Sequence, residues 1–271
     1  MKMISKTLLA CAVATVCAFS ANIASAQTAG DTLPNFVVDA PGTVIPNFTA
    51  DQITGKYVEI ANFGTDGSFN VSLYWKAAAF VRNDGTVQLD STVTGLTNSY
   101  GLYALYTANG TYTTSGTRTN FNFAADKPGS LSLFLDPNRD TEFTAPATSG
   151  DFTSVGTAGD ILLATGKPQF GTGFVDPSLP TCPANAGNYC GSFGSRTTFA
   201  LTADGSSFFV SPSPFYQLSF QSGQVNNFQP TGRQIVNGSL DVSFAVPEPA
   251  SVALLGLGLL GLGLSRRRKQ A

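Results

Sequence analysis

Large apolar residues alternate with smaller or more polar ones along several short stretches of this 271-residue chain. Between residues 68 and 76 every second position is large and apolar, namely Phe69, Val71, Leu73 and Trp75. The same period of two recurs in residues 131–135 and 240–244. Because successive side chains of a β-strand point to opposite faces, this pattern predicts strands that each bury one face.

Asn-Gly and Asp-Gly pairs lie between many of these stretches. Both pairs readily adopt the positive φ angles of the tight turns that join antiparallel strands. Five pairs therefore predict five hairpin tips: Asp66-Gly67, Asp84-Gly85, Asn109-Gly110, Asp204-Gly205 and Asn237-Gly238. The 21 Phe and eight Tyr residues also favour strands. We expect an all-β domain over residues 27–245, an antiparallel β-sandwich or jelly roll of about a dozen short strands.

The first 26 residues have the pattern of a secretory signal peptide. Lys2 and Lys6 precede an apolar stretch over residues 7–19. Ala24-Ser25-Ala26 then supplies the small residues that signal peptidase requires before its cleavage site. We expect the mature protein to begin at Gln27.

Residues 246–271 combine three features in a fixed order. Pro247, Glu248 and Pro249 form a stiff tripeptide that cannot join a helix interior or a central strand. The apolar run 250–264 is about 22 Å long as a helix, whereas the hydrocarbon core of a bilayer is about 30 Å thick. The basic cluster Arg266, Arg267, Arg268 and Lys269 follows, which favours a cytoplasmic position for that end. A short helix of this kind suits transient anchoring in the inner membrane, and an ordinary C-terminal anchor is the alternative.

This tail resembles the PEP-CTERM sorting signal. The resemblance rests on Val246-Pro247-Glu248-Pro249-Ala250-Ser251, the Leu- and Gly-rich apolar run and the terminal basic cluster. It implies that the protein is a substrate of an exosortase in a Gram-negative bacterium that exports polysaccharide. It also implies transient insertion in the inner membrane, followed by a place at the cell surface or in the extracellular matrix.

Removing both ends changes the charge of the protein. All 17 acidic residues lie between Gln27 and Pro249, but only nine of the 15 basic residues remain outside the signal peptide and the terminal basic cluster. The exported body therefore carries a net charge of −8 rather than −2. Such a charge argues against nucleic acid as a partner, because phosphates need a basic surface. It suits solubility outside the cell, or divalent cations that bridge to an anionic polymer.

Cys182 and Cys190 are the two cysteines that remain after removal of the signal peptide. In an oxidising compartment, a lone pair that closes a short loop is most simply a disulfide. Two thiols without any histidine would make a poor zinc site.

Residues for catalysis are scarce. The chain has no histidine, which excludes Ser-His-Asp and Cys-His sites and any histidine-ligated metal. One stretch, residues 135–142, places oxygen ligands at alternate positions: Asp136, Asn138, Asp140 and Glu142. These could wrap a hard cation such as calcium, although a polar turn after a strand is the alternative. No other cofactor is expected.

Aromatic side chains suggest contact with carbohydrate, because flat rings cover the faces of sugars. The first candidates are Trp75, Tyr100, Tyr103 and Tyr106. Alternating aromatic residues in strands more often belong to the core, and we expect Trp75 to be a core residue.

The body also resembles the flocculation-associated PEP-CTERM protein. The similar segments are 98–108, 133–141, 160–166 and 209–216, which include Leu-Phe-Leu-Asp-Pro-Asn-Arg-Asp-Thr and Phe-Val-Ser-Pro-Ser-Pro-Phe-Tyr. The resemblance implies a role in holding cells and exopolysaccharide together in flocs, and it supplies no catalytic residues. We expect an exported, non-enzymatic surface or matrix protein that promotes flocculation or biofilm assembly with exopolysaccharide. A secreted enzyme that modifies matrix polysaccharide is the alternative.

Overall fold

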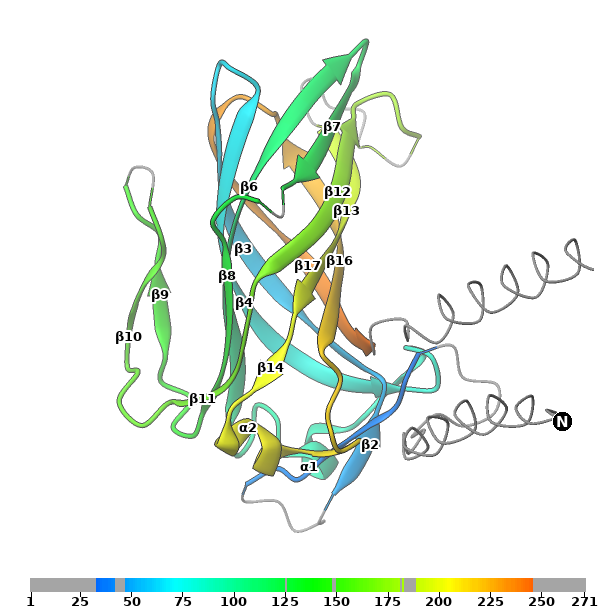
Figure 1. The fold of residues 1–271 in the computed structure, drawn as a ribbon, viewed down its shortest axis with the longest axis vertical. Helices are drawn as coiled ribbons and strands as arrows, with labels where there is room; N and C mark the ends of the chain where they lie inside the picture. The colour runs from blue at the N-terminus through cyan, green and yellow to red at the C-terminus, as the bar shows by residue number, and fades with distance from the viewer. Residues whose placement is uncertain are drawn as a thin grey trace, which may run out of the picture.

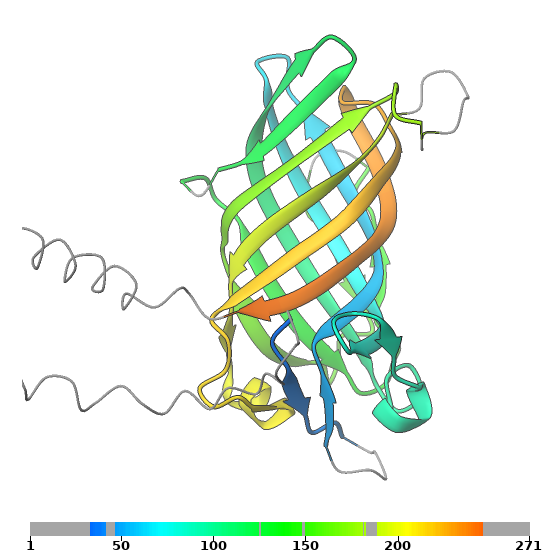
Figure 2. The same cartoon turned by 90° about the vertical axis from the view of Figure 1, so that its right-hand side faces the viewer.

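Eight antiparallel strands close into a barrel in the computed structural model, which describes residues 33–41, 47–124, 126–147, 150–180, 182 and 189–245. Around the barrel the strand order is β4-β6-β7-β12-β13-β16-β17-β3, and β3 returns to β4. Figures 1 and 2 show these strands crossing the barrel wall obliquely. Their bounds are β3 Gln52–Phe63, β4 Ser68–Arg82, β6 Gly101–Ser115, β7 Arg118–Phe123, β12 Pro168–Asp176, β13 Tyr189–Thr198, β16 Leu218–Phe228 and β17 Gly232–Ala245.

The remaining elements extend the sheet or cover the lower end of the barrel in Figure 1. β8 (Ser130–Asp136) pairs with the first half of β6 and is followed by β11 (Ile161–Gly166) and β14 (Ala200–Leu201), while β5 (Val87–Gln88) pairs with β4. A three-stranded sheet of β1 (Phe36–Val38), β2 (Phe48–Ala50) and β15 (Phe209–Ser211) lies at the lower end with the short helices α1 (Ser91–Thr94) and α2 (Ala203–Phe208).

The predicted all-β, antiparallel class is confirmed, but a closed barrel replaces the predicted sandwich or jelly roll. Closure depends on β6, which pairs with β4 along one edge and with β7 and β8 along the other. One continuous sheet therefore curls round and buries its inner face against itself. A period of two predicts which side chains face inward, but it is the same for two packed sheets and for one closed sheet.

The alternating apolar residues predicted to face inward do so. Phe69, Val71, Leu73 and Trp75 are each at most 5% exposed, and the leucines of residues 131–135 are at most 7% exposed. Aromatic rings close the interior at both ends. Near the β3–β4 and β6–β7 hairpins the cluster consists of Phe63, Phe69, Tyr112 and Phe121. At the lower end it consists of Phe36, Phe80, Phe199, Phe209, Phe215 and Phe244.

Two of the five predicted hairpin tips are correct. Asp66-Gly67 joins β3 to β4, and Asp84-Gly85 joins β4 to β5 with positive φ at both residues. The other three predictions are wrong, because Asn109-Gly110 lies within β6, Asn237-Gly238 within β17 and Asp204-Gly205 in α2. In α2 the preceding Thr202 caps the helix by accepting a hydrogen bond from the Gly205 N–H, so its Thr-Ala-Asp-Gly sequence starts a helix.

The glycines inside the strands make room for aromatic rings. A Cβ at Gly110 would overlap the ring of Phe69 and the backbone of Asn122, and one at Gly238 would lie 2.9 Å from the ring of Tyr57. Gly55 stands in the same relation to Trp75, Gly171 to Phe123 and Gly223 to Phe193. The barrel thus packs large rings on one strand against the bare backbone of a neighbouring strand.

We expect Gly110→Ala to destabilise the protein by about 1–3 kcal/mol, because the new methyl group must displace the Phe69 ring or the backbone of β7. The matched control is Gly194→Ala on β13, where the nearest atom to a Cβ is an oxygen at 3.8 Å. Denaturant unfolding measures both variants. Equal stability of the two would show that ring packing does not require glycine at position 110.

A hairpin of β9 (Glu142–Thr144) and β10 (Thr153–Val155) packs along the outer face of the barrel (Figure 1). Tyr74 on β4 stacks on Phe143 with ring centroids 4.5 Å apart and meets the edge of Phe152 at 4.9 Å. The hairpin and Phe152 cover β4 on its outer side at Ser72 and Tyr74, which explains why Ser72 is only 6% exposed. The Phe152 N–H donates to the Ser72 hydroxyl at 3.3 Å.

Candidate functional site

The residues predicted for sorting lie outside the described residues. These are the signal cleavage residues Ala24, Ala26 and Gln27, the sorting motif 246–251 and the basic residues 266–269. The predicted apolar helix over residues 250–264 lies outside them as well. Within the part of the chain that the structure describes, no helix has the length and hydropathy to cross a membrane.

Cys182 and Cys190 form a disulfide, with their Cα atoms 5.6 Å apart. Cys190 is the second residue of β13, and Cys182 belongs to the connection that follows β12. The disulfide therefore ties the loop between two neighbouring barrel strands to the barrel wall.

The predicted calcium loop is a hydrogen-bonded turn. The Asp136 carboxylate accepts hydrogen bonds from the backbone N–H groups of Asn138 and Thr141, both at 3.1 Å, and from that of Arg139. Glu142 is 76% exposed at its side chain and lies 3.9 Å from the Lys76 ammonium group. Among the described residues no three acidic, histidine or cysteine side chains gather where they could hold a metal. Calcium binding stays a prediction.

Sequence reasoning missed Asp160, which lies beside this turn. Its Oδ2 accepts hydrogen bonds from the Tyr103 hydroxyl at 2.6 Å and from the Thr141 hydroxyl at 2.8 Å. Burial and the bond to Asp160 raise the pKa of Tyr103. The cluster fastens the turn after β8 to β6 through Asp160 Oδ2, while Oδ1 of the same carboxylate is buried without a hydrogen-bond partner among the described residues.

The four aromatic residues proposed for sugar contact are all buried. Trp75 is 2% exposed and donates its indole N–H to the Leu240 carbonyl at 3.1 Å, as the core interpretation predicted. Tyr100 is fully buried, while Tyr103 and Tyr106 are 4% and 8% exposed. Sugar contact through the three tyrosines is therefore excluded in this fold, because no ring face is open to solvent.

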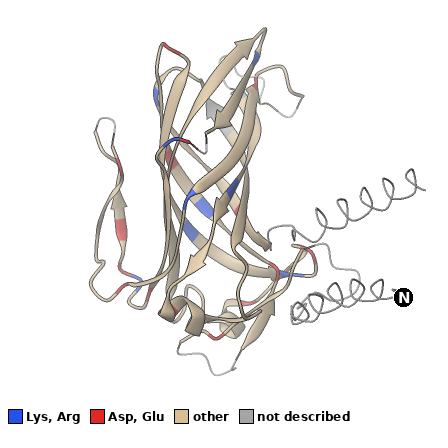
Figure 3. Ribbon diagram, in the orientation of Figure 1, with Lys and Arg blue, Asp and Glu red and all other residues tan. Residues whose placement is uncertain are grey.

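Other aromatic residues are exposed, on the outer face of β12, β13 and β16. Phe170 is 56% exposed and Phe220 37%, and both lie directly across from Arg196 in the strand registers. The next positions along the same face carry Thr172, Ser222 and Gln224, which are exposed and polar. We call this surface, with Phe174, Arg118, Asn120 and Asn122, the outer aromatic face. Charged residues occupy little of the described barrel ribbon in Figure 3. Arg118 and Arg196 on this face are both exposed.

A groove of about 530 Å³ crosses this face between β7, β12 and β13. Arg118 lies over the ring of Phe174, with its guanidinium carbon 3.7 Å from the ring centroid, and its Nε donates to the Asn120 side chain at 2.9 Å. The guanidinium group is thus held in place by stacking and by one hydrogen bond, and Arg118 lines the groove.

The pattern around residues 170–175 explains why this face was missed. In Phe-Gly-Thr-Gly-Phe-Val the large residues Phe170 and Phe174 point outward and the glycines point inward. A Cβ at Gly171 would overlap the Phe123 ring, and one at Gly173 would lie 3.0 Å from Phe193. The interior space opposite β12 is filled from other strands, which a local pattern does not reveal.

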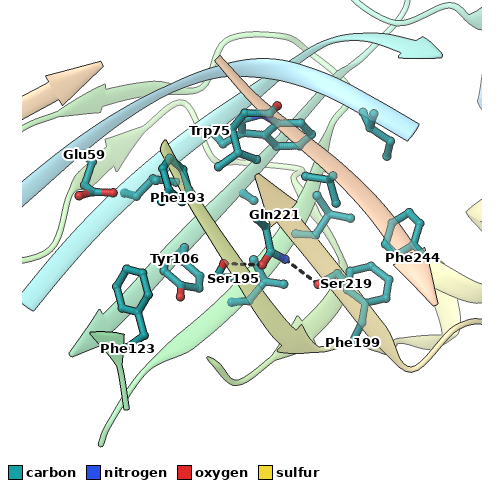
Figure 4. Close-up of a pocket in the computed structure, with 17 residues that line it drawn as sticks. Glu59, Trp75, Tyr106, Phe123, Phe193, Ser195, Phe199, Ser219, Gln221 and Phe244 are labelled. Atoms are coloured by element: carbon teal, nitrogen blue, oxygen red, sulfur yellow. Dashed lines mark hydrogen bonds between the residues drawn. The ribbon is translucent and has the colours of Figure 1, made fainter. Parts of the chain in front are cut away.

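Small cavities of about 50 Å³ and about 40 Å³ lie in the barrel interior among the described residues. Glu59, Phe123 and Phe193 line both, and Figure 4 shows these side chains on one side of the larger cavity. Gln221 lies near the centre of the view, where its Oε1 accepts from the Ser195 hydroxyl at 2.8 Å and its Nε2 donates to Ser219 at 2.7 Å. The hydrogen-bonding atoms of Gln221 are therefore satisfied.

Glu59 is the one acidic or basic residue among those that line the two cavities. It points inward from β3, between Tyr57 and Ala61, because every second residue of that strand faces the interior. Burial raises its pKa to about 7, since the charged carboxylate loses its hydration. The same cause raises the pKa of Tyr57 and Tyr106, so both phenols stay neutral across the physiological range.

Comparison with known protein families found a match at the end of the chain. Residues 245–269 match the family model described as the PEP-CTERM protein-sorting motif, which supports the predicted role as an exosortase substrate. This motif implies export and transient membrane anchoring before sorting to the cell surface. No curated protein and no solved structure matches the chain. The resemblance of the body to the flocculation-associated protein stays a prediction.

Proposed function

We propose that this protein is a non-catalytic surface or matrix protein that binds exopolysaccharide on its outer aromatic face and so promotes flocculation or biofilm assembly. The observation that carries the proposal is the exposed row Phe170, Arg196 and Phe220 beside the Arg118 groove. The sorting motif supports delivery to the surface of a Gram-negative cell, where such polymers are found.

The outer aromatic face has the two kinds of group that a sugar polymer needs. Exposed phenyl rings pack against the apolar faces of sugar rings. Hydroxyl and amide groups of Thr172, Ser222, Asn120 and Asn122 stand beside them and can bond sugar hydroxyls. The face spans four neighbouring strands, so it offers an extended surface rather than a closed pocket for one sugar.

A matrix-modifying enzyme is the second candidate, and the raised pKa of Glu59 is the observation that favours it. Hydrolysis of a glycosidic bond ordinarily uses two carboxyl groups flanking that bond. Glu59 has no carboxylate partner among the cavity-lining residues, and cavities of about 50 and 40 Å³ do not admit a sugar chain. These features support the non-catalytic proposal.

We expect Arg118→Ala to weaken binding of the full-length protein to the exopolysaccharide of its source bacterium about tenfold. The substitution removes a guanidinium group already held in place by Phe174 and Asn120, and a tenfold loss corresponds to about 1.4 kcal/mol. Isothermal titration calorimetry with the purified polymer measures the dissociation constant.

Lys56→Ala is the matched control, because it removes an equal charge from the exposed outer side of β3, away from the outer aromatic face. Strains carrying each chromosomal variant are then scored for floc formation, after normal polysaccharide secretion has been verified. Equal binding and equal flocs for Arg118→Ala, Lys56→Ala and wild type would remove the outer aromatic face from the proposal. Polymer cleavage by the purified protein would favour the enzyme instead.

A further inference from the structure

The barrel encloses a carboxyl group that has no partner. The Glu59 side chain makes no hydrogen bond or ion pair with the residues that the structure describes, and no lysine or arginine lines either cavity beside it. A buried carboxylate without a counter-charge loses far more hydration energy than its surroundings return. At neutral pH the site therefore lacks the positive charge that would stabilise the Glu59 carboxylate.

A second polar group in the same cavity is also unsatisfied. Tyr106 is 8% exposed, and its hydroxyl oxygen is buried without a hydrogen-bond partner among the described residues. It lines the larger cavity together with Glu59, and Figure 4 shows both residues on the same side of that cavity. Ser195, which lines the same cavity, lies close enough to lower the pKa of Tyr106, but its hydroxyl donates to Gln221.

The walls around Glu59 are aromatic. The smaller cavity is lined by rings from Tyr57, Phe63, Phe69, Phe121, Phe123 and Phe193. The faces of such rings carry partial negative charge and attract cations, more strongly when water is excluded. A carboxylate surrounded by rings is the combination with which proteins bind organic ammonium ions.

We propose that the barrel interior is a binding site for a small primary ammonium ion, recognised by Glu59, the Tyr106 hydroxyl and the surrounding rings. The carboxylate supplies the counter-charge and accepts N–H hydrogen bonds. The Tyr106 oxygen accepts another, and the alkyl part of the ligand packs on the rings. The ligand contains only a few heavy atoms, because the two cavities measure about 50 and 40 Å³.

Other ligand classes fit the interior less well. Calcium takes six to eight oxygen ligands, far more than the cavity offers around Glu59. Anions are repelled by the carboxylate. A cavity of about 150 Å³ is needed for benzene, so aromatic and drug-sized ligands are too large. A neutral alkane would leave the Glu59 carboxylate and the Tyr106 hydroxyl without partners.

Ligand and proton compete for Glu59. Because the pKa of this carboxyl group is about 7, binding should be strongest above pH 7 and weaken about tenfold for each unit below it. No other described residue that lines the two cavities titrates in that range. Tyr57 and Tyr106 stay neutral there, and the remaining polar lining residues, Ser195, Ser219 and Gln221, do not ionise.

The test is thermal unfolding of the full-length protein at pH 8 with methylammonium chloride, against sodium chloride at equal ionic strength. We expect a saturable rise in melting temperature with methylammonium alone, since a ligand that binds only the folded state stabilises it. Tetramethylammonium, which has no N–H group, should give no rise. The rise should be absent at pH 5 and in Glu59→Gln, and smaller in Tyr106→Phe.

A second measurement does not depend on any variant. The methyl resonance of ¹³C-labelled methylammonium should shift upfield when the ion is bound among aromatic rings, and the shift should saturate with protein concentration. Equal melting temperatures in methylammonium and sodium chloride, together with an unshifted resonance, would overturn the proposal. A rise of equal size in Glu59→Gln would place the ion on the protein surface and overturn it as well.

Discussion

Glu59→Gln is expected to stabilise the protein strongly at pH 8 while leaving its stability near pH 4.5 unchanged. The folded state holds the Glu59 carboxyl with a pKa of about 7, against 4.5 for the unfolded chain. Between these values the folded state binds more protons, so the free energy of unfolding falls as pH rises from about 4.5 and levels off above about 7. The expected loss is on the order of 3 kcal/mol, and glutamine, which resembles protonated glutamate, avoids it.

Urea unfolding at pH 4.5, 6 and 8 measures this effect. The chain contains no histidine, so few other groups titrate in this window and the change can be assigned to Glu59. Glu142→Gln is the control, because that side chain is 76% exposed and lies outside the barrel. A wild-type protein whose stability is flat from pH 4.5 to 8 would contradict the placement of the Glu59 carboxyl group in the barrel interior.

Trp75→Ala is expected to destabilise the protein by about 3–5 kcal/mol. Trp75 is 2% exposed, covers the bare backbone of Gly55 on the neighbouring strand β3 and reaches Leu240 on β17. Removing the ring leaves a large cavity and also leaves the Leu240 carbonyl without its indole donor. In a closed barrel the opposite wall is held by backbone hydrogen bonds all the way round, so the structure can collapse into that cavity only in part.

Phe170→Ala is the comparison for Trp75→Ala, since it also removes an aromatic ring from a barrel strand but from a side chain that is 56% exposed. We expect its stability to lie within about 0.5 kcal/mol of wild type. Guanidinium unfolding at pH 6 distinguishes the two. Similar losses for both variants would mean that the inner and outer faces of the barrel are assigned the wrong way round.

Several parts of the fold could be predicted from local pattern. The inward faces of residues 68–76 and 131–135 follow from period-two alternation, which holds wherever the strand pairs. The Asp66-Gly67 and Asp84-Gly85 turns follow from positive φ angles, which are a local property. The same rule wrongly predicted turns at Gly110 and Gly238. These glycines are required because Phe69 and Tyr57 on other strands lie against them.

The candidate sites were predicted less well than the strands. Tyr100, Tyr103 and Tyr106 belong to the interior or to packed loops, whereas Phe170 and Phe220 are exposed. Residue type alone does not distinguish these aromatic groups, because a ring on either face of a strand has the same local pattern. The sequence did not predict that Glu59 faces the interior, because a single acidic residue in an apolar strand is ordinarily expected to face solvent.

By itself, the sequence determined the sorting signal and the individual strands of this protein. The sorting motif at residues 245–269 and the alternating strands are linear patterns, legible without knowing which segments meet. Only the tertiary structure decided that β4 pairs with β6, and this pairing closes the sheet into a barrel. Closure gives the strands an inside and an outside, and it thereby places Glu59 among rings and Phe170 in solvent. These outcomes depend on contacts between residues far apart in the chain, which no short window of sequence contains.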